Sequence, residues 1–391
     1  MKNNKLIKPW STQGEKHEEV ISFKKNNIIQ LKSREITDYS SLSFQCSFGV
    51  TNTEIKKSLK NACTGNLVTI SKYYSQIQEK SAKRLCQLLK LDGKIFFTSS
   101  GAESTEHALK ICRHATKRTV ILSRQKSYHG ATMAASQVTG DWRRTNIFMP
   151  QDGHYFLPEP SEDPTFEKAI KIINKIGPEK IAGIFLETIS AKNGVHDIPE
   201  TWWKNLTKLQ LENGIKIILD EVVCGFFRTG KAFGFQHYSI KPDIVTMGKA
   251  ISNGMAPLGA VFFSKELMKF YENTILPSGL TNFAHPLSLG AFAGVDKIIS
   301  APTFQSKIKE NIKIIKEWLN SLGPLINGYR GKGFLYGIEL YHTPPVDFFD
   351  KKNIHIVTNQ NLLIFCPVIT MSKNELKNAL KKLEQAIREL K

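Results

Sequence analysis

The sequence has 391 residues, of which 41% are hydrophobic, 10% aromatic and 23% charged, and these fractions exclude a disordered or fibrous chain. The length suits one large domain with a smaller one, each able to bury a core. Its 54 lysines and arginines against 35 acidic residues give a net charge of +19. Because the basic residues occur as singles and pairs without a nucleic-acid-binding motif, we expect a generally basic surface or a preference for anionic substrates rather than nucleic-acid binding.

Short strand patterns alternate with longer helical patterns through the middle of the chain. Strands are predicted at 94–100, 119–123, 181–187, 215–222 and 243–249, and helices at 102–115 and 202–214. This alternation predicts an α/β fold whose mainly parallel sheet is covered by helices on both faces, because parallel strands need crossover connections. Ligands of such sheets bind at the carboxyl ends of the strands, so the chemistry is expected just after these runs.

The C-terminal third has a different pattern. It predicts a helix at 304–322, a strand at 334–340 and a last helix at 376–390, whose core-facing stripe would be Leu376, Leu380, Leu383 and Ile387. We expect a smaller α+β domain formed by residues 1–50 and 290–391, packed against a large domain at 51–289. The proline-rich segment 158–164 is expected to be a surface loop, because its prolines cannot serve a central strand.

Six cysteines are scattered without a CxxC pair, so the sequence suggests neither a zinc site nor a disulfide framework. Reduced thiols are typical of a cytoplasmic protein. The basic N-terminal segment lacks the apolar run of a secretion signal, and no stretch approaches the roughly 18 consecutive apolar residues of a membrane span. We therefore expect a cytoplasmic protein with no metal site and no membrane segment.

Polar residues of complementary kinds follow four of the predicted strands. At the strand-to-helix turn Ser100, Gly101 and Ala102, free amides and the helix dipole favour an anion. Asp220 ends another apolar strand, where a buried carboxylate needs a cationic partner. Lys249 follows a third strand, and a lysine partly removed from water becomes nucleophilic toward carbonyls.

The fourth strand is followed by Tyr128, which offers an aromatic face. Taken singly, these features have ordinary alternatives, such as a helix cap at Ser100 or a solvated lysine at 249. Together, an anion cradle, a buried acid, a stacking ring and a strand-end lysine describe a site for a phosphorylated aromatic aldehyde with a protonated ring nitrogen. That ligand is pyridoxal 5′-phosphate (PLP).

Over residues 96–340 the sequence also resembles the class III (omega) aminotransferases of the PLP fold-type I group. The most specific stretches are IILDEVVCGFFRTG and PDIVTMGKAISNGMAPLGAV, and the others are FFTSSGAESTEHALK, SYHGATMAASQVTGD, IFLETISAKNGV, TNFAHPLSLGA and YRGKGFLYGIEL. The resemblance implies a mainly parallel seven-stranded sheet, PLP as the cofactor and a homodimer with shared active sites.

The resemblance also implies roles for individual residues. Lys249 matches the lysine that forms the internal aldimine and later moves the substrate Cα proton, and Asp220 matches the acid that keeps the pyridine nitrogen protonated. Tyr128 matches the aromatic residue stacked on the ring, and Val222 matches the apolar residue on its other face.

The remaining cofactor contacts are implied in the same way. Ser100, Gly101 and Ala102 match the phosphate cradle, and Thr281 matches a threonine that reaches the phosphate from the neighbouring subunit. Glu187 matches the first acid of the family's EPxxGExG motif.

The sequence departs from the family where substrates are recognised. The proline and the second glutamate of EPxxGExG are Thr188 and Lys192. The arginine that often binds the substrate carboxylate is absent from the C-terminal stretch NLLIFCPVIT, and SFGVTNTEI replaces the glycine-histidine motif near residue 50. We therefore expect retained cofactor chemistry and altered substrate recognition.

Five further residues have open interpretations. Arg143 or Arg144 could bind an acidic group or be solvated, and Trp10 could line the substrate entrance or simply pack. His285 is expected to be structural, and His129 to lie outside the direct contacts. The stretch from SYHGAT to VTGDWRR is similar to members that act on taurine, β-alanine or other ω-amino compounds with pyruvate.

The sequence thus predicts a PLP-dependent aminotransferase that moves an amino group from an amino acid or ω-amino compound to a keto acid, pyruvate or 2-oxoglutarate. One alternative is an aminomutase, racemase or decarboxylase on the same scaffold, which would need no keto acid. Another is a basic binding protein on a catalytically lapsed scaffold, against which the presence of both Lys249 and Asp220 argues.

Overall fold

The computed structural model of the chain describes residues 6–15, 18–65, 68–70, 72–145, 147 and 152–390. At its centre lies a seven-stranded sheet whose strands are, in spatial order, β4 (Gly93–Thr98), β12 (Gly259–Ser264), β11 (Ile244–Met247), β10 (Lys216–Asp220), β7 (Ile181–Glu187), β5 (Val120–Arg124) and β6 (His154–Leu157). Only β12 runs antiparallel to its neighbours in this sheet. The predicted α/β fold with a mainly parallel sheet is confirmed.

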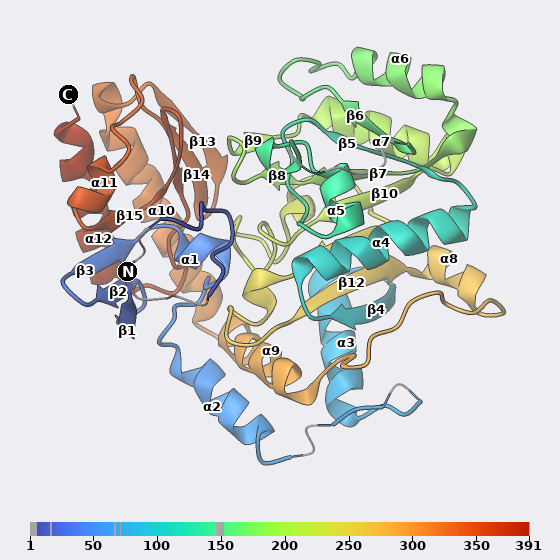
Figure 1. Cartoon of the computed structure of the whole chain (residues 1–391), viewed down its shortest axis with the longest axis horizontal. Helices are drawn as coiled ribbons and strands as arrows, with labels where there is room; N and C mark the ends of the chain where they lie inside the picture. The colour runs from blue at the N-terminus through green and yellow to red at the C-terminus, as the bar shows by residue number, and fades with distance from the viewer. Residues whose placement is uncertain are drawn as a thin grey trace.

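Helices cover both faces of this sheet, and Figure 1 shows α4 running across one of them. The helices of this part are α2 (Thr53–Ala62), α3 (Gln76–Leu89), α4 (Gly101–Thr116), α5 (Met133–Val138), α6 (Glu167–Ile176), α7 (Glu200–Asn213), α8 (Lys265–Met268) and α9 (Pro286–Ile299). Adjacent residues of β10 point to opposite faces of the sheet. Ile217 packs in the hydrophobic core on the side of α7, and Ile218 packs in the core on the side of α4. Burial on both faces explains why these strands are apolar throughout. In the described ranges, no helix has the length and apolar character to cross a membrane.

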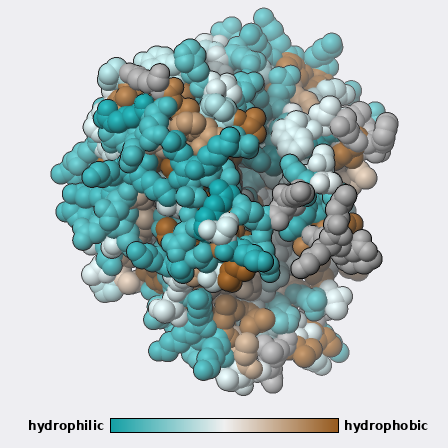
Figure 2. Space-filling view, turned by 60° about the vertical axis from the view of Figure 1, so that its left-hand side comes forward, coloured by the Kyte–Doolittle hydropathy of each residue, from teal (hydrophilic) through white to brown (hydrophobic). Residues whose placement is uncertain are grey.

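Two smaller sheets lie on the left of Figure 1: the N- and C-terminal segments share one, and the C-terminal segment alone forms the other. One contains β1 (Val20–Lys24), β2 (Ile28–Leu31), β3 (Glu35–Asp38) and β15 (Ile354–His355), and the other β13 (Gly328–Lys332), β14 (Leu335–Glu339), β17 (Leu362–Phe365) and β16 (Val357–Asn359). The helices here are α1 (Ser41–Phe44), α10 (Phe304–Ser321), α11 (Phe348–Lys351) and α12 (Lys373–Arg388). The predicted stripe of α12 is buried. The face in Figure 2 is mainly hydrophilic.

Division of the chain into a large domain at 51–289 and a small domain from the flanking segments stays a proposal. Strand β15 pairs in parallel with β3, so the two ends of the chain do form one sheet. Helix α9, however, runs without a break from Pro286 to Ile299, across the proposed boundary.

The segment 158–164 is only in part the surface loop that was predicted. It forms neither helix nor strand, but Glu159 and Asp163 are only 1% and 2% exposed. The Glu159 carboxylate accepts a hydrogen bond from the Lys126 amide at 2.6 Å, and that of Asp163 accepts one from the Ala169 amide at 2.9 Å. These amides replace water, so the acids can be buried.

Arg228 joins three distant parts of the chain. It is 0% exposed, and its guanidinium donates to the carbonyl oxygen of Pro367 at 2.6 Å and to the hydroxyl of Ser47 at 2.7 Å. It also donates to the hydroxyl of Ser41 at 3.2 Å. The arginine therefore connects the N-terminal and C-terminal segments to the loop that follows β10.

We expect Arg228→Ala to lower the free energy of unfolding by about 3 kcal/mol or more, because removing one buried charged partner leaves several acceptors without donors. Arg388→Ala is the matched control, since Arg388 pairs with Glu384 on the surface and contributes less than about 1 kcal/mol. Denaturant unfolding measures both values. Equal losses in the two variants would contradict this role for Arg228.

Candidate active site

A cavity of about 350 Å³ opens at the carboxyl ends of β7, β10 and β11. Seven of the nine residues predicted as its site line it, namely Gly101, Ala102, Tyr128, Glu187, Asp220, Val222 and Lys249. Ser100 and Thr281 do not line it. The structure thus brings together side chains that are far apart in the sequence, at the edge of the sheet where ligands of parallel sheets bind.

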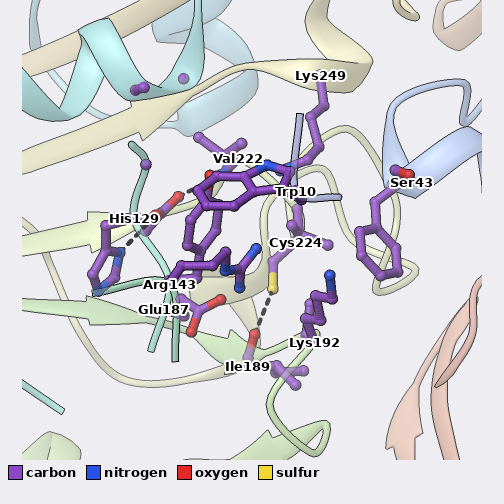
Figure 3. Close-up of a pocket in the computed structure, with 18 residues that line it drawn as sticks. Trp10, Ser43, His129, Arg143, Glu187, Ile189, Lys192, Val222, Cys224 and Lys249 are labelled. Atoms are coloured by element: carbon purple, nitrogen blue, oxygen red, sulfur yellow. Dashed lines mark hydrogen bonds and ion pairs between the residues drawn. The ribbon is translucent and has the colours of Figure 1, made fainter. Parts of the chain in front are cut away.

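Lys249 lies just after β11, and Figure 3 shows its side chain entering the cavity. Its φ of +48° is in the left-handed region, which residues other than glycine rarely adopt and which is often found at functional sites. Burial lowers the pKa of the Lys249 amine, although the carboxylates of Asp220 and Glu187 oppose the change. More of this amine is therefore unprotonated at a given pH than in an exposed lysine, as attack on a carbonyl requires.

Asp220, the last residue of β10, is held from two sides. One carboxylate oxygen accepts a hydrogen bond from the Val222 amide at 3.0 Å, and the other lies 2.8 Å from Nδ1 of His129. Both side chains are buried, and the His129 ring packs against Phe185 with 4.2 Å between ring centroids. His129 therefore fixes the position of Asp220, a role that the sequence did not reveal. A fixed carboxylate with spare acceptor capacity suits a protonated ring nitrogen.

The N-terminus of α4 forms the anion cradle. Gly101 and Ala102 are its first two residues, and their amides have no intrahelical acceptor. A Cβ atom at Gly101 would lie 3.0 Å from the Val222 methyl groups, and one at Gly248 would lie 3.1 Å from the Gly101 backbone. These glycines let the ends of β10 and β11 approach the helix closely. The amides are then available to a phosphate group.

Ser100 and Thr281 are placed differently from the other predicted residues. The Ser100 hydroxyl caps α4 by accepting a hydrogen bond from the Glu103 amide at 3.2 Å. Thr281 lies in an exposed turn outside the cavity. A phosphate contact from either residue stays a prediction, which for Thr281 requires a second subunit.

A buried ionic group extends from Glu187, which lines the cavity, to Arg124 and Glu159, which do not. Glu187 is 7% exposed, and burial raises its pKa to about 7 against the opposing effects of His129 and Arg124. The fully buried Arg124 guanidinium lies 3.9 Å from the Glu187 carboxylate and 3.7 Å from that of Glu159. The sequence analysis missed Arg124 and Glu159, although a charged residue that ends the apolar run VILSR could have drawn attention to Arg124.

The structure distinguishes the two neighbouring arginines. The Arg143 guanidinium lies 3.4 Å from the Tyr128 ring centroid and lines the cavity, whereas Arg144 lies over Phe156 at 4.8 Å. Trp10 also lines the cavity, with its ring edge-on to Tyr128 at 6.2 Å.

His285 has the structural role that was expected, since its Nδ1 accepts a hydrogen bond from the Leu287 amide at the start of α9. Lys192, which was singled out only as a departure from the family motif, also lines the cavity.

The chemistry of these groups fits PLP: an amine for the aldehyde, an acid for the ring nitrogen, an aromatic face and free amides for the phosphate. Together with the sheet, they define a PLP-dependent enzyme of fold type I. The sequence model of the aminotransferase class-III family matches residues 13–387, and the chain belongs to this family of PLP-dependent transaminases. The prediction of fold, family and cofactor is confirmed.

Known relatives agree with this assignment. The chain is 31% identical to the acetylornithine aminotransferase of Bacillus subtilis over 81% of its length and 80% of that protein. It superimposes with a TM-score of 0.91 on taurine:2-oxoglutarate aminotransferase from Bifidobacterium kashiwanohense in complex with PLP and glutamate, at 26% identity, covering 98% and 95% of the two chains. An S-selective transaminase from Arthrobacter sp. has the same fold, with a TM-score of 0.91 at 23% identity and coverages of 99% and 96%.

We expect borohydride to trap added PLP on Lys249 at pH values where exposed lysines react little, because the lowered pKa leaves more of this amine unprotonated. The yield falls as the pH decreases below that lowered pKa. Peptide mapping by mass spectrometry over a pH series measures the yield at each lysine. Equal labelling of Lys249 and an exposed lysine such as Lys204 would contradict the expectation.

Proposed function

We propose that the cavity holds PLP against Lys249 and Asp220, and that the protein moves an amino group from an amino acid or ω-amino compound to a keto acid such as pyruvate or 2-oxoglutarate. One observation carries this proposal. The amine of Lys249 and the buried carboxylate of Asp220, braced by His129, line one cavity at neighbouring strand ends.

The bound cofactor would supply an electron sink for the amine-bearing carbon of the substrate. Nζ of Lys249 would bind the cofactor and, once displaced, accept and return the substrate proton, a role that its lowered pKa supports. Asp220 would keep the ring nitrogen protonated. The amides of Gly101 and Ala102 would hold the phosphate, while Tyr128 and Val222 would enclose the ring.

Two relatives support the proposal that the substrates are amino acids or ω-amino compounds. One is named for the transfer of an amino group between taurine and 2-oxoglutarate, and the other for acetylornithine. Both donors carry an acid group besides the amine. The net charge of +19 would also favour the approach of anionic donors and keto acids.

We expect transamination by the PLP-loaded enzyme in a donor-by-acceptor screen, and its loss in Lys249→Ala by a factor on the order of 10² to 10⁴, because the lysine moves the proton. Amino acid analysis of the acceptor product measures the rate, and Lys204→Met on the exposed face of α7 is the control. Conversion of the donor without any keto acid would contradict transamination and indicate a racemase, aminomutase or decarboxylase.

We also propose that the active unit is a homodimer in which Thr281 of one subunit reaches the phosphate bound by the other. Exposed apolar side chains support an interface: Val68, Tyr73 and Tyr74 are 87%, 66% and 81% exposed and border one surface cavity with Pro286.

A cytoplasmic location is supported by the six cysteines, all of which are free thiols, and is tested by cell fractionation.

We expect sedimentation velocity to show a dimer for the unmodified protein and a shift toward monomer in the double variant Val68→Asp, Tyr74→Asp, because charges would enter an apolar interface. Val346→Asp is the matched control, since Val346 is fully exposed in a loop away from this surface. A dimer that persists in the double variant would exclude this surface as the interface.

A further inference from the structure

One end of the cavity carries two cations, Arg143 and Lys192, and among the residues that the structure describes only Arg143 has an acidic partner. Figure 3 shows Lys249 entering from one side and Lys192 from the opposite side, with Arg143 between them. In the part of the chain that the structure describes, the Lys192 amine makes no hydrogen bond and no ion pair. Partly buried cations usually have such partners, so this amine is available to a ligand.

The backbone around Lys192 is anchored on both sides. It follows β8 (Ile189–Ser190) and precedes β9 (His196–Asp197), which together form a short hairpin. Before the turn, the Cys224 thiol donates to the carbonyl oxygen of Ile189 at 3.3 Å. After it, the Arg330 guanidinium donates to the carbonyl oxygen of Gly194 at 2.6 Å. The hairpin therefore keeps the lysine directed at the cavity.

The charges nearby do not neutralise Lys192. Its pKa is lowered mainly by burial and then by the positive charge of Arg143, with only Asp141 opposing. The Asp141 carboxylate is already occupied, because both of its oxygens accept from Nε of Arg143 at 3.0 Å. Two cations and one paired carboxylate remain at this end of the cavity. Such a charge distribution favours an anionic ligand.

The acids at the other end are also engaged. Asp220 is bound by His129, and Glu187 lies beside the buried Arg124. Neither acid opposes the lowering of the Lys192 pKa. Both of these lining carboxylates are therefore engaged within the chain, whereas no described residue pairs with Lys192.

We propose that Lys192 binds the acid group of the amino donor, a carboxylate or sulfonate, while the donor amine lies toward Lys249. The inference rests on the proposed function, because it assumes that the donor occupies this cavity. Arg143 contributes positive charge to this end of the cavity. Because Arg143 is already paired with Asp141, the direct contact with the acid group of the donor is assigned to Lys192. Lys192 thereby selects compounds that carry both an amine and an oxyanion over neutral amines.

The test compares Lys192→Met, Lys192→Arg and the control Lys204→Met as PLP-loaded enzymes. Donors are β-alanine, taurine and propylamine, which carry a carboxylate, a sulfonate and no acid group. We expect Lys192→Met to raise KM for the two acidic donors roughly tenfold or more, with little change in kcat and in the KM for propylamine. Lys192→Arg should restore most of the affinity, and Lys204→Met should change nothing. An unchanged KM, or equal changes for all three donors, would overturn the assignment.

A binding measurement separates this inference from the proposed function. Propionate and ethanesulfonate lack an amine and cannot react, so calorimetric titration of the PLP-loaded protein reports anion binding whether or not transamination occurs. We expect Lys192→Met to weaken binding of at least one of them roughly tenfold. If the protein binds PLP but transfers no amino group, the proposed function fails while calorimetry still decides the role of Lys192. Equal binding by unmodified and Lys192→Met protein would overturn it.

Discussion

A buried carboxylate at the end of a central strand is the constraint on which the active site depends. Asp220 lies where β10 leaves the sheet, 5% exposed, and an isolated charge in that position would be strongly unfavourable. The His129 ring and the Val222 amide form hydrogen bonds with the Asp220 carboxylate and fix its orientation. Asp220 also lines the cavity, where under the proposed function its carboxylate would accept a hydrogen bond from a protonated ring nitrogen. The fold therefore prepares the site before the cofactor binds.

Close approach of three segments gives this site its shape. The ends of β10 and β11 meet the start of α4 at glycines 101 and 248, where an added Cβ atom would lie only 3.0 and 3.1 Å from neighbouring atoms. Next to Gly248, Lys249 has a left-handed backbone conformation. Backbone strain of this kind persists only where surrounding packing maintains it, and here two apolar cores on either face of the sheet do so. Amine, acid and amides are thus held by rigid elements.

The two ends of the cavity differ in how their charges are matched. The two acids that line the cavity have partners inside the chain: Asp220 is paired with His129, and Glu187 lies beside Arg124. At the outer end, Lys192 replaces the second glutamate of the family motif and faces Arg143, while the C-terminal arginine of the family is absent. The cation proposed to bind the donor acid lies on the β8–β9 hairpin rather than in the C-terminal stretch. Such a change alters substrate choice without disturbing the cofactor chemistry.

The sequence by itself determined the fold class, the family and the cofactor, and seven of the nine residues predicted from it line the cavity. Apolar strands, helix periodicity and contiguous motifs are local, so they can be recognised without coordinates; Lys249 after its strand and the stripe of α12 are examples. Only the tertiary structure decided which partner each polar group has. The hydrogen bond between His129 and Asp220 and the burial of Arg124 between two acids join segments remote in sequence. The different surroundings of Arg143 and Arg144, and the lack of a partner for the Lys192 amine among the described residues, also depend on such segments. Electrostatic matching depends on distances across the folded chain, and no local pattern records those distances.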